Sequence, residues 1–178
     1  MLHPNDDAQL LESVRLKLDV SGDLSTRPCR SRETRCWALP GFAGKSRVTT
    51  SFGNLPIEAL RLRDPVKTSS GEFLEVKWID KLQLDAKFMS LHPEANPILI
   101  PKGSFGRMSP DCDVMVSPAQ QLRIPRHSSD MSATSAQSIV GRGQVARKPQ
   151  NGFTYYLFHC GEPASVSIEG LWFDVTPE

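Results

Sequence analysis

Apolar and polar residues alternate along many short stretches of this chain, and a period of two residues is typical of a half-buried β-strand. The clearest case runs from Phe73 to Ile79, where Leu74, Val76 and Trp78 share one face. Further alternating, apolar or β-branched runs occupy residues 47–51, 66–68, 80–89, 98–100, 113–116, 122–124, 153–158, 164–168 and 171–175. The 14 prolines and 12 glycines supply turns between these runs. The pattern predicts an all-β fold of many short strands.

Residues 6–18 depart from this pattern and predict one short N-terminal helix. Leu10, Leu11, Val14 and Leu18 lie at helical spacing, with acidic residues at the start and basic residues near the end. We interpret this segment as a surface helix that packs on its own body. A docking helix for a partner or for the neighbouring domain stays open as the alternative.

The segment after this helix is rich in arginine and lacks periodicity. Glu33 interrupts the basic run and Trp37 is the one aromatic residue beside it, so we interpret the segment as a solvated linker rather than a polyanion-binding strip. Residues 126–150 are polar and Ser-rich, and predict a long loop with at most one short helix or strand. The predicted domains are therefore residues 1–40, an N-terminal helix and basic linker arm, and residues 41–178, a β domain.

Composition narrows the classes of partner. A formal net charge of +1 argues against nucleic acid. No apolar run approaches the roughly 18 residues of a membrane span, which argues against a membrane. The first residues are acidic and polar rather than basic and then apolar, so we expect no secretory signal and a cytoplasmic protein. No cofactor is expected, and the sequence leaves the oligomeric state open.

The four cysteines, Cys29, Cys36, Cys112 and Cys160, match no zinc pattern, because the chain has no CxxC and its histidines are scattered. No metal site is therefore predicted. Cys29 and Cys36 lie among arginines, which favour the thiolate, so either is a candidate reactive thiol. Cys160 lies beside His159 and near Glu162, which imitates a Cys–His pair. Adjacent strand residues point to opposite faces, so Cys160 is interpreted as a core or surface thiol.

Four blocks of residues occur in a recognisable order between residues 41 and 175. The framework positions are Phe42, Val48, Thr50, Gly53, Glu58 and Leu60, then Asp64, Val66, Trp78 and Ile79, then Gly103, Gly106, Asp113, Ser117, Pro118 and Leu122, and finally the stretch 155–175. Together they resemble bacterial Hint domains, the fold shared by inteins and the autoprocessing half of hedgehog proteins. The resemblance implies a compact Hint-like all-β fold.

The resemblance also implies a site chemistry. In active members a thiol or hydroxyl at the first position attacks the preceding carbonyl, and a histidine protonates the leaving nitrogen. Here Gly41 stands at the first position and Gln120 at the central histidine. Gly161 stands at a later histidine, followed by Glu162. These four are predicted to be vestigial site positions with no catalytic residue among them, and the protein is expected not to be an enzyme.

The expected function is thus a catalytically inactive Hint-like domain that acts as a binding or structural module for a protein partner. Two alternatives stay open. One is a divergent self-cleaving Hint protein that cuts near Cys29 or Cys36. The other is a component of a larger phage-like assembly, anchored through the N-terminal arm.

Overall fold

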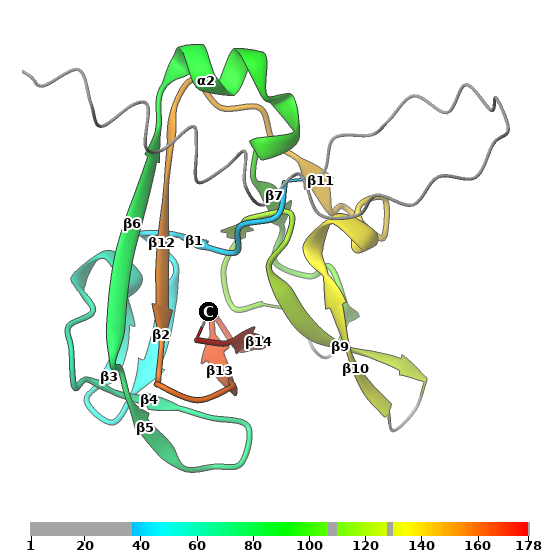
Figure 1. The fold of residues 1–178 in the computed structure, drawn as a ribbon. Helices are drawn as coiled ribbons and strands as arrows, with labels where there is room; N and C mark the ends of the chain where they lie inside the picture. Colours follow the sequence, from blue (N-terminus) through cyan, green and yellow to red (C-terminus); the bar gives the residue numbers. More distant parts are fainter. Residues whose placement is uncertain (1–36, 107–109, 128–129, 178) are drawn as a thin grey trace, which may run out of the picture. The chain divides into compact units, whose positions relative to one another are not determined.

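The computed structural model describes residues 37–106, 110–127 and 130–177 (Figure 1). The chain divides into two units, residues 1–38 and residues 39–178, and the elements given below belong to the second unit. The predicted helix at residues 6–18 and the arginine-rich segment with Cys29 and Cys36 lie outside the described residues. The domain boundary after residue 40 stays a prediction.

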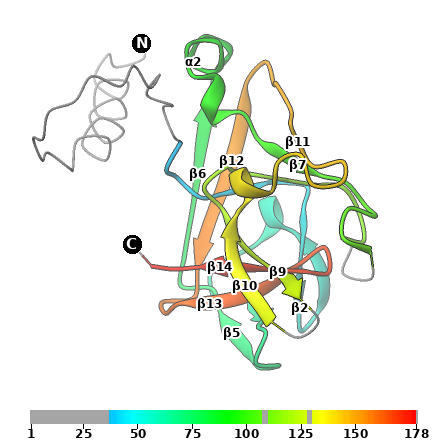
Figure 2. The same ribbon diagram turned by 90° about the vertical axis from the view of Figure 1, so that its right-hand side faces the viewer.

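Two antiparallel sheets form the body of the second unit, so the predicted all-β fold is confirmed. The first sheet has the order β11 (Ala146–Arg147), β7 (Ile98–Ile100), β8 (Val114–Val116), β1 (Phe42–Ala43), β12 (Phe153–His159) and β6 (Trp78–Leu84). The second has the order β10 (Asp130–Ser135), β9 (Gln121–His127), β14 (Leu171–Val175), β13 (Ala164–Ile168), β2 (Arg47–Thr50), β4 (Pro65–Lys67) and β5 (Phe73–Glu75), with β3 (Gly53–Pro56) paired to β2. Figure 2 shows β13 and β14 running across the direction of β6 and β12.

Helical structure among the described residues is limited to short pieces. These are the 3₁₀ turns η1 (Ile57–Ala59), η2 (Pro93–Ala95) and η4 (Ala136–Ile139) and the helix α2 (Ala86–Leu91). The alternation across 80–89 predicted a strand along its whole length, but β6 ends at Leu84. Asp85 then caps α2 by accepting a hydrogen bond from the backbone of Phe88 at 2.7 Å, which stabilises a helix start. No described helix is long and apolar enough to span a membrane.

The long loop predicted for residues 126–150 is the second difference. Residues 130–135 form β10, which pairs with β9 in a hairpin whose register places Ser132 opposite Ile124 and Thr134 opposite Leu122. Ser and Thr side chains give this strand no hydrophobic periodicity, so the sequence signal is weak. The strand forms because β9, itself paired with β14, offers a free edge to it. Ala136 and Ile139 of η4 then enter the core.

The hydrophobic core is built from both sheets, and Phe42 lies within it. Its ring packs edge-on against Phe173 at 5.4 Å between centroids and also contacts Phe158 at 5.8 Å. Phe42 is fully buried, and burying a side chain of this size contributes about 2–3 kcal/mol to stability. The residue before it, Gly41, is therefore held at a fixed point of the fold.

Candidate functional site

The segment Leu39–Gly41 enters the first sheet between two strands. Phe42 pairs with Val116 on one side and with Tyr156 on the other. Immediately past β8, the backbone N–H of Ser117 donates to the carbonyl of Gly41 at 2.8 Å. Gly41 is buried, whereas Leu39 and Pro40 remain partly exposed. We call Leu39, Pro40 and Gly41 the junction.

A tight turn after β8 aims two buried polar side chains at the junction. The turn comprises Ser117-Pro118-Ala119-Gln120 and is closed by a hydrogen bond from the Gln120 N–H to the Ser117 carbonyl at 3.0 Å. Proline in its second position fixes the backbone angle that such a turn requires. The turn places the side chains of Ser117 and Gln120 on the same side of the chain, and both are almost completely buried.

Each of these two side chains has its own contact with the junction. The Ser117 hydroxyl donates to the carbonyl oxygen of Leu39. Gln120 Oε1 accepts from the backbone N–H of Gly41 at 3.1 Å. Gln120 Nε2 donates to the carbonyls of Asp174 at 2.8 Å and Gln121 at 3.1 Å. Because both of its amide hydrogens are engaged, Gln120 meets the junction as an acceptor only.

The backbone at Gly41 is compatible only with glycine. Its φ is +150°, a value that L side chains rarely adopt. A Cβ at this position would lie 2.9 Å from the Cβ of Tyr155 and 3.3 Å from Cδ1 of the Tyr155 ring. Hydrogen bonds at both the N–H and the carbonyl of Gly41 restrict any relaxation. In this structure a side chain at position 41 would therefore strain the backbone and collide with Tyr155.

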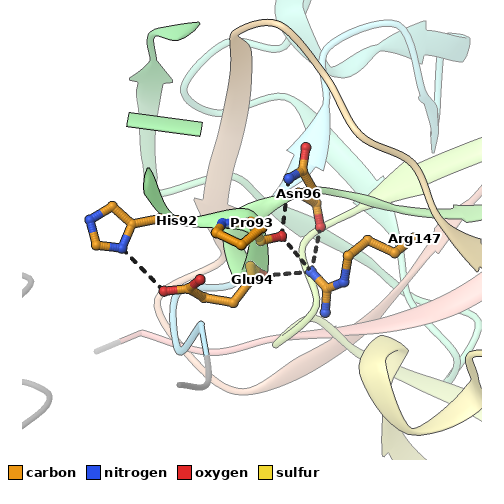
Figure 3. Close-up of polar contacts among 5 residues, drawn as sticks. All are labelled: His92, Pro93, Glu94, Asn96 and Arg147. Carbon is orange, nitrogen blue, oxygen red and sulfur yellow. Dashed lines mark hydrogen bonds and ion pairs between the residues drawn. The ribbon is translucent and has the colours of Figure 1, made fainter. Parts of the chain in front are cut away.

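Tyr155 is held in turn by the segment 92–96, which Figure 3 shows. Its hydroxyl donates to the carbonyl of Ala95 at 2.7 Å. Arg147 Nη1 donates to the carbonyls of Glu94 at 2.6 Å and Asn96 at 3.0 Å, and burial lowers the pKa of this guanidinium. Burial raises the pKa of the Tyr155 hydroxyl well above its usual range, so it stays a neutral donor. The ring against Gly41 is thus fixed at both ends.

The structure brings together only two of the four predicted positions. Gly41 and Gln120 are in contact, but Gly161 and Glu162 lie in the turn after β12. Tyr156 pairs with Phe42 beside the junction, and the end of β12 at His159 is about 10 Å further along a strand. A Cβ on Gly161 would meet Lys77 at 3.2 Å, not any junction residue.

From the sequence we predicted no role for Leu39, for the Ser117 hydroxyl or for Tyr155. A signal existed for Ser117, because a Ser-Pro turn directly after a buried strand places residues one and four of the turn side by side. No local signal marks Tyr155. Its contact with Gly41 depends on how β1 and β12 pair, across more than a hundred residues of sequence.

Cys160 is buried in the core, and its position argues against a role as nucleophile. Burial, with a smaller contribution from Glu162, raises the pKa of its thiol to about 11, although Lys77 opposes the shift. Cys112 is exposed. Cys29 and Cys36 lie outside the described residues. Within the part of the chain that the structure describes, no three His, Cys, Asp or Glu side chains are placed to hold a metal ion.

We expect iodoacetamide at pH 8 to alkylate Cys112 at least about tenfold faster than Cys160, since alkylation requires an accessible thiolate. Peptide mapping by mass spectrometry after timed quenching measures both sites in one sample. Equal alkylation rates at the two sites in the native protein would contradict the buried position of Cys160. Alkylation of Cys160 that appears only after unfolding would agree with it.

The same thiol predicts a loss of stability in alkali. The folded state keeps the Cys160 proton up to about pH 11, whereas the unfolded chain releases it near pH 9. The contribution of the protonated Cys160 thiol to the free energy of unfolding is therefore complete below pH 9 and is lost as the pH rises to about 11. Urea titrations at pH 7, 9 and 10.5 should give a falling free energy of unfolding, with a smaller fall in Cys160→Ala.

Comparison with known proteins gives the following matches. A model of the Hint domain family matches residues 40–176. No curated protein matches the chain. Among solved structures, the gp41-1 intein has 8% identity and a TM-score of 0.46, covering 76% of this chain and 98% of its own. The MchDnaB-1 intein has 10% identity and a TM-score of 0.48, covering 76% of this chain and 99% of its own. The family match confirms the predicted Hint-like fold.

The family match also corrects one prediction. From the residue types at positions 41, 120 and 161 we expected that the protein is not an enzyme. Hint domains typically process their own chains, and the match spans every strand that surrounds the junction. The prediction of a non-enzyme is therefore wrong. It treated the familiar residues as the only route to the chemistry, although a hydroxyl at Ser117 already contacts a backbone carbonyl.

Proposed function

Because the chain belongs to the Hint domain family, we propose that it is a self-processing domain that cleaves its own backbone at the junction. The observation that carries this proposal is the hydrogen bond from the buried Ser117 hydroxyl to the Leu39 carbonyl. When a nucleophile adds to a carbonyl, negative charge develops on its oxygen. A fixed donor at that oxygen lowers the barrier, and removing one such donor costs about 10²–10³ in rate.

The bond assigned to cleavage is Leu39–Pro40. Its carbonyl is the one that Ser117 polarises. The chain on the Pro40 side of this bond is held firmly. Gly41 is hydrogen-bonded to Gln120 and to Ser117, and the Phe42 ring is fixed in the core. The nitrogen of Pro40 carries no N–H in the peptide. It becomes a basic amine once the carbonyl carbon is tetrahedral, and then takes up a proton readily.

The nucleophile comes from solvent. Gly41 carries no side chain, and its surroundings leave no space for one. Leu39 and Pro40 are partly exposed, so water or a small thiol can reach the Leu39 carbonyl. The nucleophile forms a bond to the carbonyl carbon, the C–N bond to Pro40 breaks, and the nucleophile's proton ends on the Pro40 nitrogen. The products are a segment that ends in a Leu39 acid or thioester and a chain that begins with Pro40.

Intact mass spectrometry of the freshly purified full chain tests this function. Samples are incubated with and without dithiothreitol, followed by hydroxylamine to capture any thioester at Leu39. We expect time-dependent loss of residues 1–39, faster with thiol, and a new N-terminus at Pro40 in Edman sequencing. A single full-length mass under all conditions would overturn the proposal. A new N-terminus next to Cys29 or Cys36 would instead favour cleavage by one of those thiols.

A further inference from the structure

A polar pocket of about 380 Å³ lies beside the turn that joins β12 to β13. Its walls come from the turn between β4 and β5, the turn between β12 and β13, and the neighbouring parts of β9 and β14. The residues that matter are Ser69, Glu72, Arg123, Glu162, Ser165 and Asp174. We call this the β12–β13 pocket. The volume suits one large side chain or a small molecule.

One carboxylate in the β12–β13 pocket is held rigidly. Asp174 Oδ1 accepts from Arg123 Nε at 2.9 Å and from the Ser165 hydroxyl. Ser165 is itself buried, and its carbonyl accepts from the Ser69 N–H at 2.9 Å, which ties two walls together. Among the described residues, no hydrogen bond reaches the second oxygen of Asp174. A fixed carboxylate with an open oxygen is pre-organised to accept a hydrogen bond from a ligand.

The charge of the β12–β13 pocket selects the class of ligand. Glu72, Glu162 and Asp174 contribute −3 and Arg123 contributes +1, so the lining carries −2. Glu72 and Glu162 are exposed and form no ion pair within the described part of the chain. These carboxylates are not grouped closely enough for a metal ion. A single cation that interacts with all three carboxylates must therefore be an extended group, with hydrogen-bond donors on more than one of its edges.

We propose that the β12–β13 pocket binds the guanidinium group of an arginine side chain presented by a peptide. A planar guanidinium has five N–H donors and can bond the open oxygen of Asp174 while it faces Glu72 and Glu162. The hydroxyls of the Ser69 turn and the pocket volume accommodate the rest of the side chain. This inference does not rest on the proposed cleavage, because it needs no reaction. It uses the side chain of Asp174, whereas Gln120 beside the junction contacts only the Asp174 carbonyl.

The test is a titration of the ¹⁵N-labelled full chain followed by NMR. The probe is N-acetyl-arginine methylamide, and its neutral counterpart is N-acetyl-citrulline methylamide, which has the same shape without the charge. We expect the arginine probe to shift the amide signals of Ser69, Glu162 and Ser165, with a dissociation constant on the order of 1 mM. The citrulline probe should leave these signals unchanged.

A matched pair of variants makes the result specific to the β12–β13 pocket. Glu72→Gln with Glu162→Gln removes two rim charges, and should weaken the arginine probe about tenfold. Glu58→Gln with Asp80→Asn makes the same change of net charge at exposed sites outside the pocket, and should leave binding unchanged. Shifts that are absent, equal for both probes, or unaltered in the rim variant would each overturn the proposal. Preferential binding of N-acetyl-aspartate methylamide would also overturn it, since Arg123 would then dominate.

Discussion

Replacing Ser117 by alanine should slow cleavage of the Leu39–Pro40 bond by about 10²–10³, the usual effect of losing one oxyanion donor. The variant removes the Ser117 hydroxyl, which among the described residues is the side-chain donor to the Leu39 carbonyl. Pro118 and the backbone bond that closes the turn stay in place. The measurement is the initial rate at which the Pro40 N-terminus appears, taken from intact masses at a fixed thiol concentration.

Ser46→Ala is the matched control for the Ser117 variant. Ser46 is also a buried serine, but it lies between β1 and β2, and its backbone bonds go to Ala43 and Ile57 rather than to the junction. Each variant loses one buried hydroxyl, so each should cost about 1 kcal/mol of stability. A thermal melt of both proteins checks that they are equally folded. If the two variants cleave at the same rate, the Ser117 hydroxyl is not the donor that activates Leu39.

The second large effect is expected at Gly41. Gly41→Ala should lower the free energy of unfolding by about 3–4 kcal/mol, through a backbone conformation that only glycine adopts easily and a collision with Tyr155. Urea denaturation followed by tryptophan fluorescence measures the change. Gly41→Cys should suffer in the same way, so placing a thiol at the first position should disrupt the junction rather than create a nucleophile there.

Gly53→Ala separates the two causes of this loss. Gly53 also has a positive φ, +110°, but a Cβ there would meet nothing within 4 Å. It should therefore lose only the conformational part, about 1–2 kcal/mol. The difference between the two variants measures the contact with Tyr155. Equal losses at the two positions would show that the Tyr155 ring moves aside easily, and the argument for a solvent nucleophile would lose its steric basis.

Much of the sheet structure could be predicted from the sequence, because strands with one buried face leave a period of two. Residues 98–100, 164–168 and 171–175 carry this signal, and β7, β13 and β14 have these bounds. Strand β10 could not be predicted, since its Ser and Thr residues show no such period and its partner strand determines the structure. Helix α2 was missed because a single N-cap at Asp85 ends an alternation that continues in the sequence.

The candidate site was predictable in part and for a physical reason. Residues within one turn lie close together regardless of how the rest of the chain folds. Ser117 and Gln120 could therefore be placed together from the sequence. What they contact depends on pairing between distant strands. The sequence therefore indicated what Gly41 lacks, but not that Tyr155 closes the space or that Leu39 receives the Ser117 hydroxyl. Loss of the familiar residues was consequently mistaken for loss of activity. The expectations of a protein partner and of a phage-like assembly stay predictions.

The amide of Gln120 has a consequence for when such a domain would act. Neither Ser117, Gly41 nor Gln120 changes its charge between about pH 5 and 8, in contrast to a histidine at the same place. We therefore expect none of these three residues to add a pH-dependent step to the rate of the proposed cleavage between about pH 5 and 8. If the junction cleaves as proposed, the rate at a given site in the cell is set by the concentration of small thiols there rather than by the local pH.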